Sequence, residues 1–166
     1  MKIQDYKIKD WDDIETGILL DENNDWILIK SNPVDFQIDG YKLINKKHIQ
    51  EILPNPQAEI LNKVFTLKKE VVQIPDSFEF TSTIGFLKWI EKKYGCFEFQ
   101  DEIENELFYG VLNQINDKSF YIDMVKSDGS LDEDFDVEFF IDDIRILTFE
   151  SDYFNSISLL FKHNNS

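Results

Sequence analysis

Two stretches of the chain follow one pattern, and this internal repeat constrains the fold more than any other feature of the sequence. The first stretch runs from Gly17 to Ile52 and the second from Gly110 to Leu147. Each opens with a glycine and a hydrophobic pair, passes through a polar turn into an apolar strand, and closes on an Ile-rich segment. Self-similarity over this length favours duplication of one structural unit.

Pairing Gly17 with Gly110 aligns apolar positions along both copies with only short gaps. The aligned pairs are Trp26 with Phe120, Leu43 with Phe139, and Ile49 with Ile144. The same alignment continues into the two tails, where it pairs Ile60, Phe65, Leu67 and Lys68 with Phe154, Leu159, Phe161 and Lys162.

Short apolar strands joined by polar turns make up most of both copies. The turn Asp21–Asp25 predicts a hairpin between 16–20 and 26–30, because Asn and Asp bond their own backbone and tolerate left-handed conformations. Residues 35–39 alternate as a strand would, with Phe36 and Ile38 on one face. Further strands are expected at 96–99, 107–112, 119–125, 135–141 and 145–149. Many short strands at such spacing are typical of a small sandwich or barrel.

Helices are expected in two places. Residues 58–69 have moderately helical apolar spacing, and the segment from Thr81–Thr83 to Tyr94 has a capping residue at its start and Gly95 at its end. The tail Ile157–Phe161 is apolar and compatible with a strand. Because Pro75-Asp76-Ser77 breaks the chain between the copies, the expected domains are 1–74 and 75–166.

Each copy resembles a small SH3-like barrel, and in particular its Sm-like variant. Tyr109-Gly110-Val111-Leu112 leading to Asp117 is similar to the Gly-x-Leu and downstream Asp of the first Sm motif. Phe140-Ile141-Asp142-Asp143-Ile144-Arg145 is similar to the strand-corner-strand close of such barrels, and the helix before the second copy matches the N-terminal helix of the family. The resemblance implies a mainly β protein of two tandem SH3-like/Sm-like barrels with minor α structure.

The family resemblance also implies RNA binding, for which the basic residues Lys42, Lys46 and Lys47 of the first copy are the candidates. The chain departs from the family where its phosphate-binding cation usually lies. Arg145 is followed by Ile146, and the first copy has Gln50-Glu51 at this point. Nucleic-acid binding is therefore kept as the alternative function.

Acidic residues dominate the second half of the chain. The net charge is −16, and the segment from Glu98 to Asp152 holds 17 acidic residues against three basic ones. Such a field repels phosphate backbones and attracts cationic surfaces. We therefore expect a protein-interaction module that binds a basic protein partner, in its most concrete form an inhibitor or immunity-type protein. The candidate partner-binding residues are Asp128, Asp132, Glu133, Asp134, Asp136, Asp142 and Asp143.

Groups that carry catalysis or metal binding are sparse. His48 and His163 lie in different copies without a metal-ligand spacing, and Cys96 sits between Gly95 and Phe97 as a small buried side chain would. The acidic loop at 128–134 lacks the spacing of an EF-hand calcium loop, and no Gly-rich phosphate loop or nucleophile elbow occurs. No enzyme activity, cofactor or metal is expected, although a paired-carboxylate hydrolase stays open as a third reading.

The single cysteine is typical of a reducing compartment, because it cannot form an internal disulfide. No apolar run approaches the roughly 20 residues that span a bilayer, and the N-terminus lacks the apolar core of a signal peptide. The sequence thus favours a cytoplasmic protein without membrane association. No feature of the sequence indicates an oligomeric state.

Overall fold

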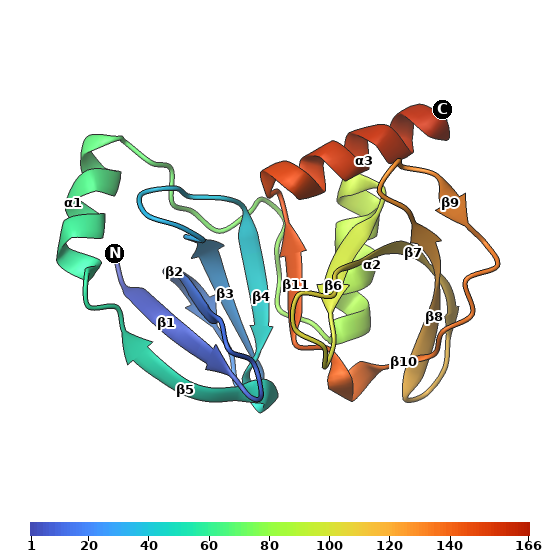
Figure 1. The fold of residues 1–166 in the computed structure, drawn as a ribbon, viewed down its shortest axis with the longest axis horizontal. Helices are drawn as coiled ribbons and strands as arrows, with labels where there is room; N and C mark the ends of the chain where they lie inside the picture. Colours follow the sequence, from blue (N-terminus) through green and yellow to red (C-terminus); the bar gives the residue numbers. More distant parts are fainter. The chain divides into compact units, whose positions relative to one another are not determined.

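The computed structural model describes residues 1–166, which form two compact units, Met1–Glu79 and Phe80–Ser166 (Figure 1). Both units are built on antiparallel strands, and three α-helices accompany them. The expected mainly β class is confirmed. The boundary lies between Glu79 and Phe80, whereas the predicted boundary lies between residues 74 and 75.

The first unit is a five-stranded antiparallel sheet with one α-helix. Its elements are β1 (Ile3–Ile8), β2 (Ile14–Glu22), β3 (Trp26–Ser31), β4 (Tyr41–Asn45), the 3₁₀ turn η1 (Lys46–His48), β5 (Ile49–Pro54) and α1 (Ala58–Leu67). The order β4-β3-β2-β1-β5 shows four strands joined as a meander, followed by a fifth strand that returns to pair with the first.

In the second unit one α-helix precedes the strands in the sequence and another follows them. Its elements are α2 (Thr83–Tyr94), β6 (Phe97–Gln100), β7 (Phe108–Ile115), β8 (Ser119–Val125), β9 (Leu131–Asp132), β10 (Phe139–Phe140), the 3₁₀ turn η2 (Ile141–Asp143), β11 (Ile146–Phe149) and α3 (Asp152–Asn164). The order is β10-β8-β7-β6-β11, and the short β9 pairs with β8. Again the last strand, reached through a 3₁₀ turn, pairs with the first.

The central hairpins of the two units also share a fine detail. Gly17 pairs with Ser31 and Gly110 with Met124, and each register shifts a few residues later, between Leu19 and Asp21 or between Leu112 and Gln114. Such a shift marks a β-bulge, which bends and twists a strand locally. Both sheets therefore bend at the same step of the same hairpin.

Both glycines are required by close packing of the neighbouring strand. A Cβ on Gly17 would lie 2.7 Å from the carbonyl oxygen of Lys30, and a Cβ on Gly110 would lie 2.8 Å from that of Asp123. Backbone atoms cannot move aside as a flexible side chain can. The glycine that opened each repeat in the sequence thus marks a contact between strands.

Different side chains fill the two cores. In the first unit Ile3 and Ile18 from the sheet pack with Leu61 and Phe65 from α1. In the second unit one face of the sheet is aromatic, with ring centroids 4.8–6.5 Å apart among a cluster of five phenylalanines: Phe99, Phe108, Phe120, Phe135 and Phe139. Aromatic pairs at these distances contribute beyond their buried area.

Helix α2 confirms the sequence prediction closely. Ser82 caps it, since its hydroxyl accepts a hydrogen bond from the backbone N–H of Gly85 at 3.1 Å, and Gly95 ends it in the left-handed region with φ = 93°. The helix expected at 58–69 is observed as α1.

The strand expected in the tail is wrong, because residues 152–164 form helix α3. Its start is set by Ser151, whose hydroxyl accepts from the N–H of Phe154 at 3.1 Å. Phe154, Ile157 and Ser158 form its buried face, whereas Leu159 is exposed. The strand prediction rested on alternation of apolar residues in the tail, and this alternation includes Leu159, which does not belong to the buried face.

Two other predicted strands differ from the structure. Residues 35–39 form a tight turn in which the N–H of Gln37 donates to the carbonyl of Val34 at 3.0 Å. Within the predicted strand 135–141, only Phe139–Phe140 is a strand.

The predicted alignment of the two copies is off by one residue at Trp26. Ile27, and not Trp26, occupies the register position that matches Phe120, next to the bulge of each hairpin.

No helix of the structure is both long enough and apolar enough to cross a lipid bilayer.

Candidate functional site

The seven acidic residues predicted to bind a partner lie at three places in the second unit. Asp128 belongs to a turn between β8 and β9, and Asp132 to Asp136 form β9 and the loop that follows it. Asp142 and Asp143 lie in η2, after β10. The structure therefore brings only the middle group together as a site.

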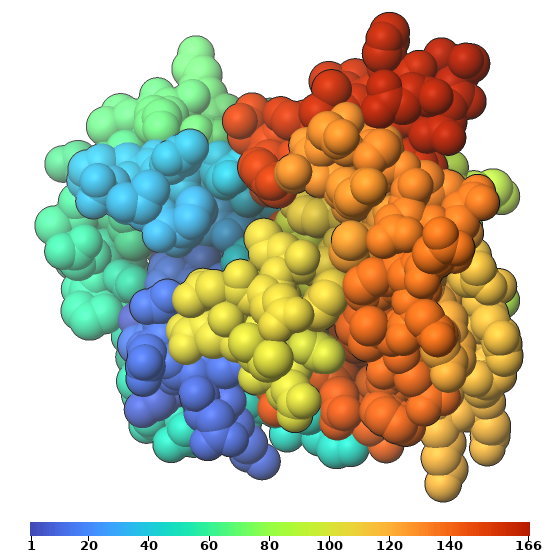
Figure 2. Space-filling model, turned by 45° about the vertical axis from the view of Figure 1, so that its right-hand side comes forward, coloured from blue at the N-terminus to red at the C-terminus, as the bar shows by residue number.

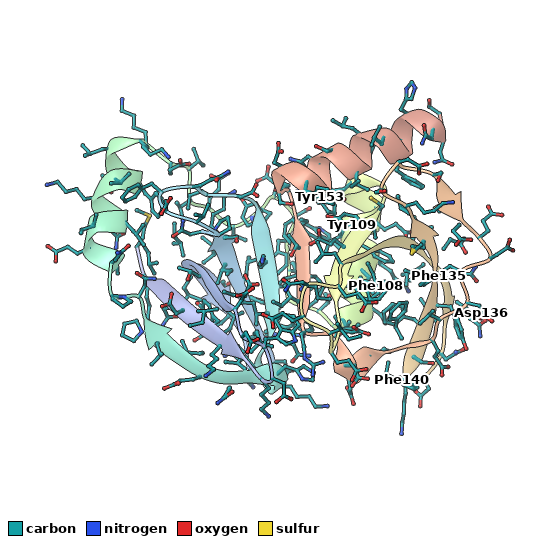
Figure 3. The ribbon with its side chains drawn as sticks, viewed as in Figure 1. Phe108, Tyr109, Phe135, Asp136, Phe140 and Tyr153 are labelled. Carbon is teal, nitrogen blue, oxygen red and sulfur yellow. The ribbon has the colours of Figure 1, made fainter.

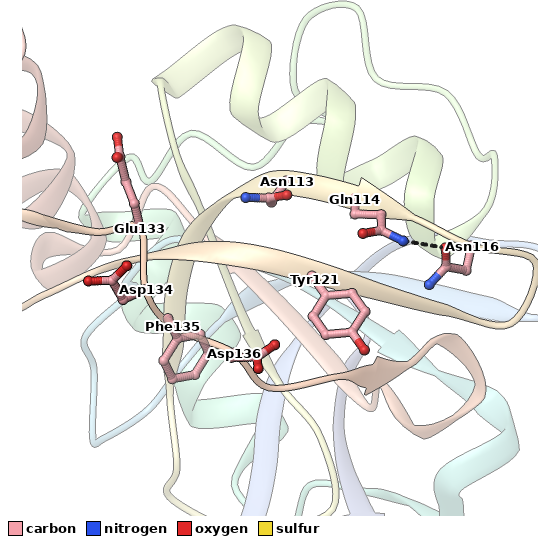
Figure 4. A pocket seen from close by; sticks show the side chains of 8 residues that line it. All are labelled: Asn113, Gln114, Asn116, Tyr121, Glu133, Asp134, Phe135 and Asp136. Atoms are coloured by element: carbon pink, nitrogen blue, oxygen red, sulfur yellow. Dashed lines mark hydrogen bonds between the residues drawn. The ribbon is translucent and has the colours of Figure 1, made fainter.

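Three acids of that middle group, all except Asp132, line a pocket of ≈ 530 Å³, called the acidic pocket below (Figure 4). Glu133, Asp134, Phe135 and Asp136 form one wall. The opposite wall is the β7–β8 hairpin, which contributes Asn113, Gln114, Asn116 and Tyr121. No lysine or arginine lines the pocket.

Hydrogen bonds orient the hairpin wall. The side-chain amide of Asn113 donates to Oδ1 of Asp123 at 2.7 Å, and that of Gln114 donates to Oδ1 of Asn116 at 2.9 Å. Asn113 is the residue at the bulge, so the bend in β7 sets its direction. The carboxylate of Asp123 thereby adds a further negative charge beside the pocket.

Tyr121 shows the electrostatic character of the acidic pocket. Its hydroxyl donates to Oε2 of Glu138 at 3.4 Å. Partial desolvation, followed by the nearby charges of Glu138 and Asp136, raises the pKa of Tyr121 above its ordinary value. The ring stays neutral and can offer its face to a cation while its hydroxyl holds a carboxylate in place.

Asp128 is held by its own turn. Its Oδ1 accepts from the backbone N–H of Ser130 at 2.9 Å and from the Ser130 hydroxyl at 2.6 Å. These bonds lower the pKa of Asp128 below its ordinary value, so its carboxylate is charged.

No group of three or more histidine, cysteine or acidic side chains in the structure is arranged to hold a metal ion.

A second pocket of ≈ 530 Å³, called the apolar pocket below, was not anticipated from the sequence. Its floor is buried and consists of Tyr109, Val125 and Ile157, which come from β7, β8 and α3. Leu107, Met124 and Tyr153 form its apolar rim, and the rings of Tyr109 and Tyr153 are 5.8 Å apart (Figure 3). Its existence depends on α3, which the sequence pattern had suggested to be a strand.

A buried hydrogen bond fixes the floor of the apolar pocket. The Tyr109 hydroxyl donates to Oε1 of Glu98, and these two residues are cross-strand partners between β6 and β7. Burial, followed by the charge of Glu98, raises the pKa of Tyr109 strongly. In the first unit, the Thr16 hydroxyl donates to Asp5 at 2.7 Å across the corresponding strands.

The other candidate groups are dispersed. Cys96 is buried as expected, and burial raises the pKa of its thiol to about 11. His163 lies on α3, whereas His48 lies in η1 of the first unit. Cys96 precedes β6, so these three groups lie on different parts of the fold.

The lysines proposed for RNA binding are partly engaged within the first unit. Lys42 forms an ion pair with Glu15 at 2.6 Å, and Lys46 forms one with Glu22 at 3.3 Å. A phosphate would have to compete with these carboxylates for both cations.

Comparison of the chain with protein-family models, with characterised proteins and with solved structures gives no match.

Proposed function

We propose that the two units are diverged copies of one small SH3-like barrel of the Sm-like variant. Support comes from the shared strand order, the 3₁₀ turn before each final strand, the bulge at the same step, and the equivalent bonds Thr16–Asp5 and Tyr109–Glu98. Apolar alternation alone would not reproduce a bulge and a polar cross-strand pair at matching positions.

The protein is a non-enzymatic interaction module whose second unit binds a basic protein partner. The observation that carries this proposal is the acidic pocket, where Glu133, Asp134 and Asp136 face a polar hairpin with no cation among the lining residues. A cleft lined by one sign of charge focuses the electrostatic field and concentrates opposite charge. An inhibitor or immunity-type protein, which covers a cationic toxin or nuclease, is its most concrete form.

A lysine or arginine of the partner would enter between the loop and the hairpin. There it would meet the three carboxylates, and the rings of Tyr121 and Phe135 could bind it by cation–π contact. Charge pairs of this kind raise the association rate and suppress wrong partners more than they add affinity. Binding is therefore expected to be fast and to weaken steeply with salt.

A non-enzymatic role is supported by the chemistry of the remaining groups. The thiol of Cys96 is buried, with its pKa raised to about 11, so the reactive thiolate is not formed near neutral pH. The two histidines lie in separate units. A paired-carboxylate hydrolase would need two close acids of separated pKa in one cleft, and Glu91, the acid with a raised pKa, lines neither pocket.

The test is affinity capture with the whole chain and two charge-matched variants. The site variant carries Glu133→Gln, Asp134→Asn and Asp136→Asn, and the control variant carries Glu51→Gln, Asp10→Asn and Asp21→Asn in the first unit. Each loses three negative charges. A basic protein that is retained by the wild-type chain and the control at about 50 mM salt, but not by the site variant, supports the proposal.

Equal retention by the two variants would show that net charge alone attracts the captured protein. Recovery of no basic protein from the native host at low salt would contradict the proposed function itself.

A further inference from the structure

We propose that the apolar pocket is the anchor site of this interaction and takes one large apolar side chain, flanked by lysine or arginine, from the basic partner. The inference rests on the proposed function, since it assumes the same cationic partner. It adds a second point of contact, with an apolar chemistry that the acidic pocket lacks.

The walls of the apolar pocket are suited to an apolar group. Tyr109 and Ile157 are 6% and 3% exposed, whereas Leu107 and Tyr153 at the rim are 45% and 53% exposed. The pocket thus has a rigid floor and a hydrophobic rim still in contact with water. Large side chains inserted into such pockets supply most of the binding energy in many protein interfaces.

The floor offers little to a polar ligand. The Tyr109 hydroxyl is already bonded to Glu98, and no buried side-chain atom that lacks a hydrogen-bond partner belongs to a lining residue. Small-molecule sites combine an apolar cavity with convergent polar groups that orient the ligand. A protein side chain, oriented by contacts outside the pocket, fits this floor better.

Acidic residues are the sequence neighbours of three lining residues and would select the charge that flanks the occupant. Asn105 of the lining lies between Glu104 and Glu106, Ser127 precedes Asp128, and Tyr153 follows Asp152. Lys126 is the one cation of the lining and can meet a backbone carbonyl of the occupant. An apolar residue flanked by cations is complementary to this arrangement, and one flanked by carboxylates would be repelled.

The apolar and acidic pockets are close enough to serve one partner. Met124 at the rim of the apolar pocket is the strand partner of Asp132, and Glu133 of the acidic pocket is the next residue in the chain. Paired positions in a sheet lie only about 5 Å apart. In Figure 2 the segments near 105, 126 and 153, drawn in yellow, orange and red, meet on one face of the second unit.

Methionine-methyl NMR on the full chain tests the pocket directly, because the chain holds only Met1 and Met124. Met124 reports on the pocket, and Met1, 49% exposed in the first unit, is the internal control. The probes are three capped peptides: Lys-Lys-Trp-Lys-Lys, Lys-Lys-Ala-Lys-Lys and Glu-Glu-Trp-Glu-Glu. We expect the Lys-Trp peptide to shift the Met124 methyl by ring current and to bind about tenfold more tightly than the Lys-Ala peptide.

Two variants keep the result specific. Ser127→Trp, at an exposed lining position, should fill the pocket and abolish the Met124 shift, whereas Ser130→Ala in the same turn should leave it unchanged. Far-UV circular dichroism establishes that both variants are folded.

The outcomes separate the two proposals. If both lysine peptides bind equally and salt-sensitively while Met124 does not shift, the anchor site is refuted and the acidic interaction stands. If the Glu-Trp peptide shifts Met124 as strongly as the Lys-Trp peptide, the cationic occupant is refuted. If no peptide binds in about 20 mM salt, both proposals fail.

Discussion

At the scale of single residues, the two glycines that begin the repeats lie where the neighbouring strand leaves no room for a side chain. A Cβ at position 110 would lie 2.8 Å from the Asp123 carbonyl oxygen and 2.8 Å from Cδ1 of Ile122. The corresponding distances at position 17 are 2.7 Å to the Lys30 oxygen and 2.6 Å to Cδ1 of Ile29. The same steric constraint acts in both units.

Gly17→Ala and Gly110→Ala should therefore destabilise their units by similar amounts, about 1–3 kcal/mol each, because two paired strands must separate locally. Gln114→Ala, at an exposed strand position, is the control and should change stability by less than about 0.5 kcal/mol. Urea unfolding measures all three. A neutral Gly110→Ala would show that the bulged hairpin relaxes freely.

Glu91 makes stability depend on pH in an unusual direction for a carboxylate. Its Oε1 accepts from the N–H of Leu112 at 2.6 Å, yet burial outweighs this bond and raises the pKa above its ordinary value. A raised pKa means that the folded state favours the protonated acid. This contribution to stability is full below the ordinary pKa and is lost as pH rises through the raised one.

Glu91→Gln, which keeps the acceptor oxygen without the charge, should then be more stable than the wild-type chain at pH 8. The difference should shrink as the pH falls through the raised pKa of Glu91, because the folded wild-type carboxyl then gains its proton. Thermal unfolding across this pH range measures the effect, with Glu106→Gln as an exposed control that removes the same charge. A difference that grows on acidification would contradict the assignment.

At the scale of elements, prediction from sequence succeeded where a signal is local. Ser82 and Gly95 mark the ends of α2 because capping depends on a few adjacent residues. Helix α3 was missed although Ser151 caps it in the same way, because its apolar residues also read as a strand. The short extent of β10 could not be predicted, because its pairing depends on β8, which lies elsewhere in the sequence.

The candidate site likewise has one part that could be predicted from local sequence and another that could not. The acids of the acidic pocket could be named from composition, and the segment 132–136 does contain its carboxylate wall. The facing hairpin and the whole apolar pocket depend on tertiary structure, namely the bulge at Asn113 and the placement of α3. Neither has a signal in any short stretch of sequence.

Ser151→Ala tests how far α3 depends on its cap. Loss of the hydroxyl leaves the N–H of Phe154 without this acceptor and should cost about 1 kcal/mol. Ser156→Ala, within the helix and exposed, is the control and should be nearly neutral. Hydrogen exchange should show faster opening of the first turn of α3 in the Ser151 variant, and equal protection in both variants would rule out a stabilising cap.

At the scale of the whole molecule, the uneven charge predicts an uneven response to salt. The second unit carries 18 acidic and seven basic residues, against 15 and ten in the first. Self-repulsion destabilises a compact acidic unit and is screened once the Debye length falls toward 10 Å.

Raising sodium chloride from about 10 to about 150 mM should stabilise the second unit by roughly 1 kcal/mol, or about 4–8 °C for a unit of this size. The first unit should respond less. Tyrosine and phenylalanine signals of the second unit, followed by NMR during thermal unfolding, separate the two. The variant with Glu133→Gln, Asp134→Asn and Asp136→Asn should show a smaller salt response, and an equal response of both units would contradict the explanation.

The matching bulges bear on whether the two hairpins can be exchanged. Between the paired ends, Gly17 with Ser31 and Gly110 with Met124, the two hairpins have equal length, and their strands shift register at the same step. We therefore expect segment 110–124 to replace 17–31 without changing the number of residues or the position of the bulge. A chain with two copies of the polar hairpin would show whether the Asn113–Tyr121 wall of the acidic pocket folds in the same way when the first unit carries it.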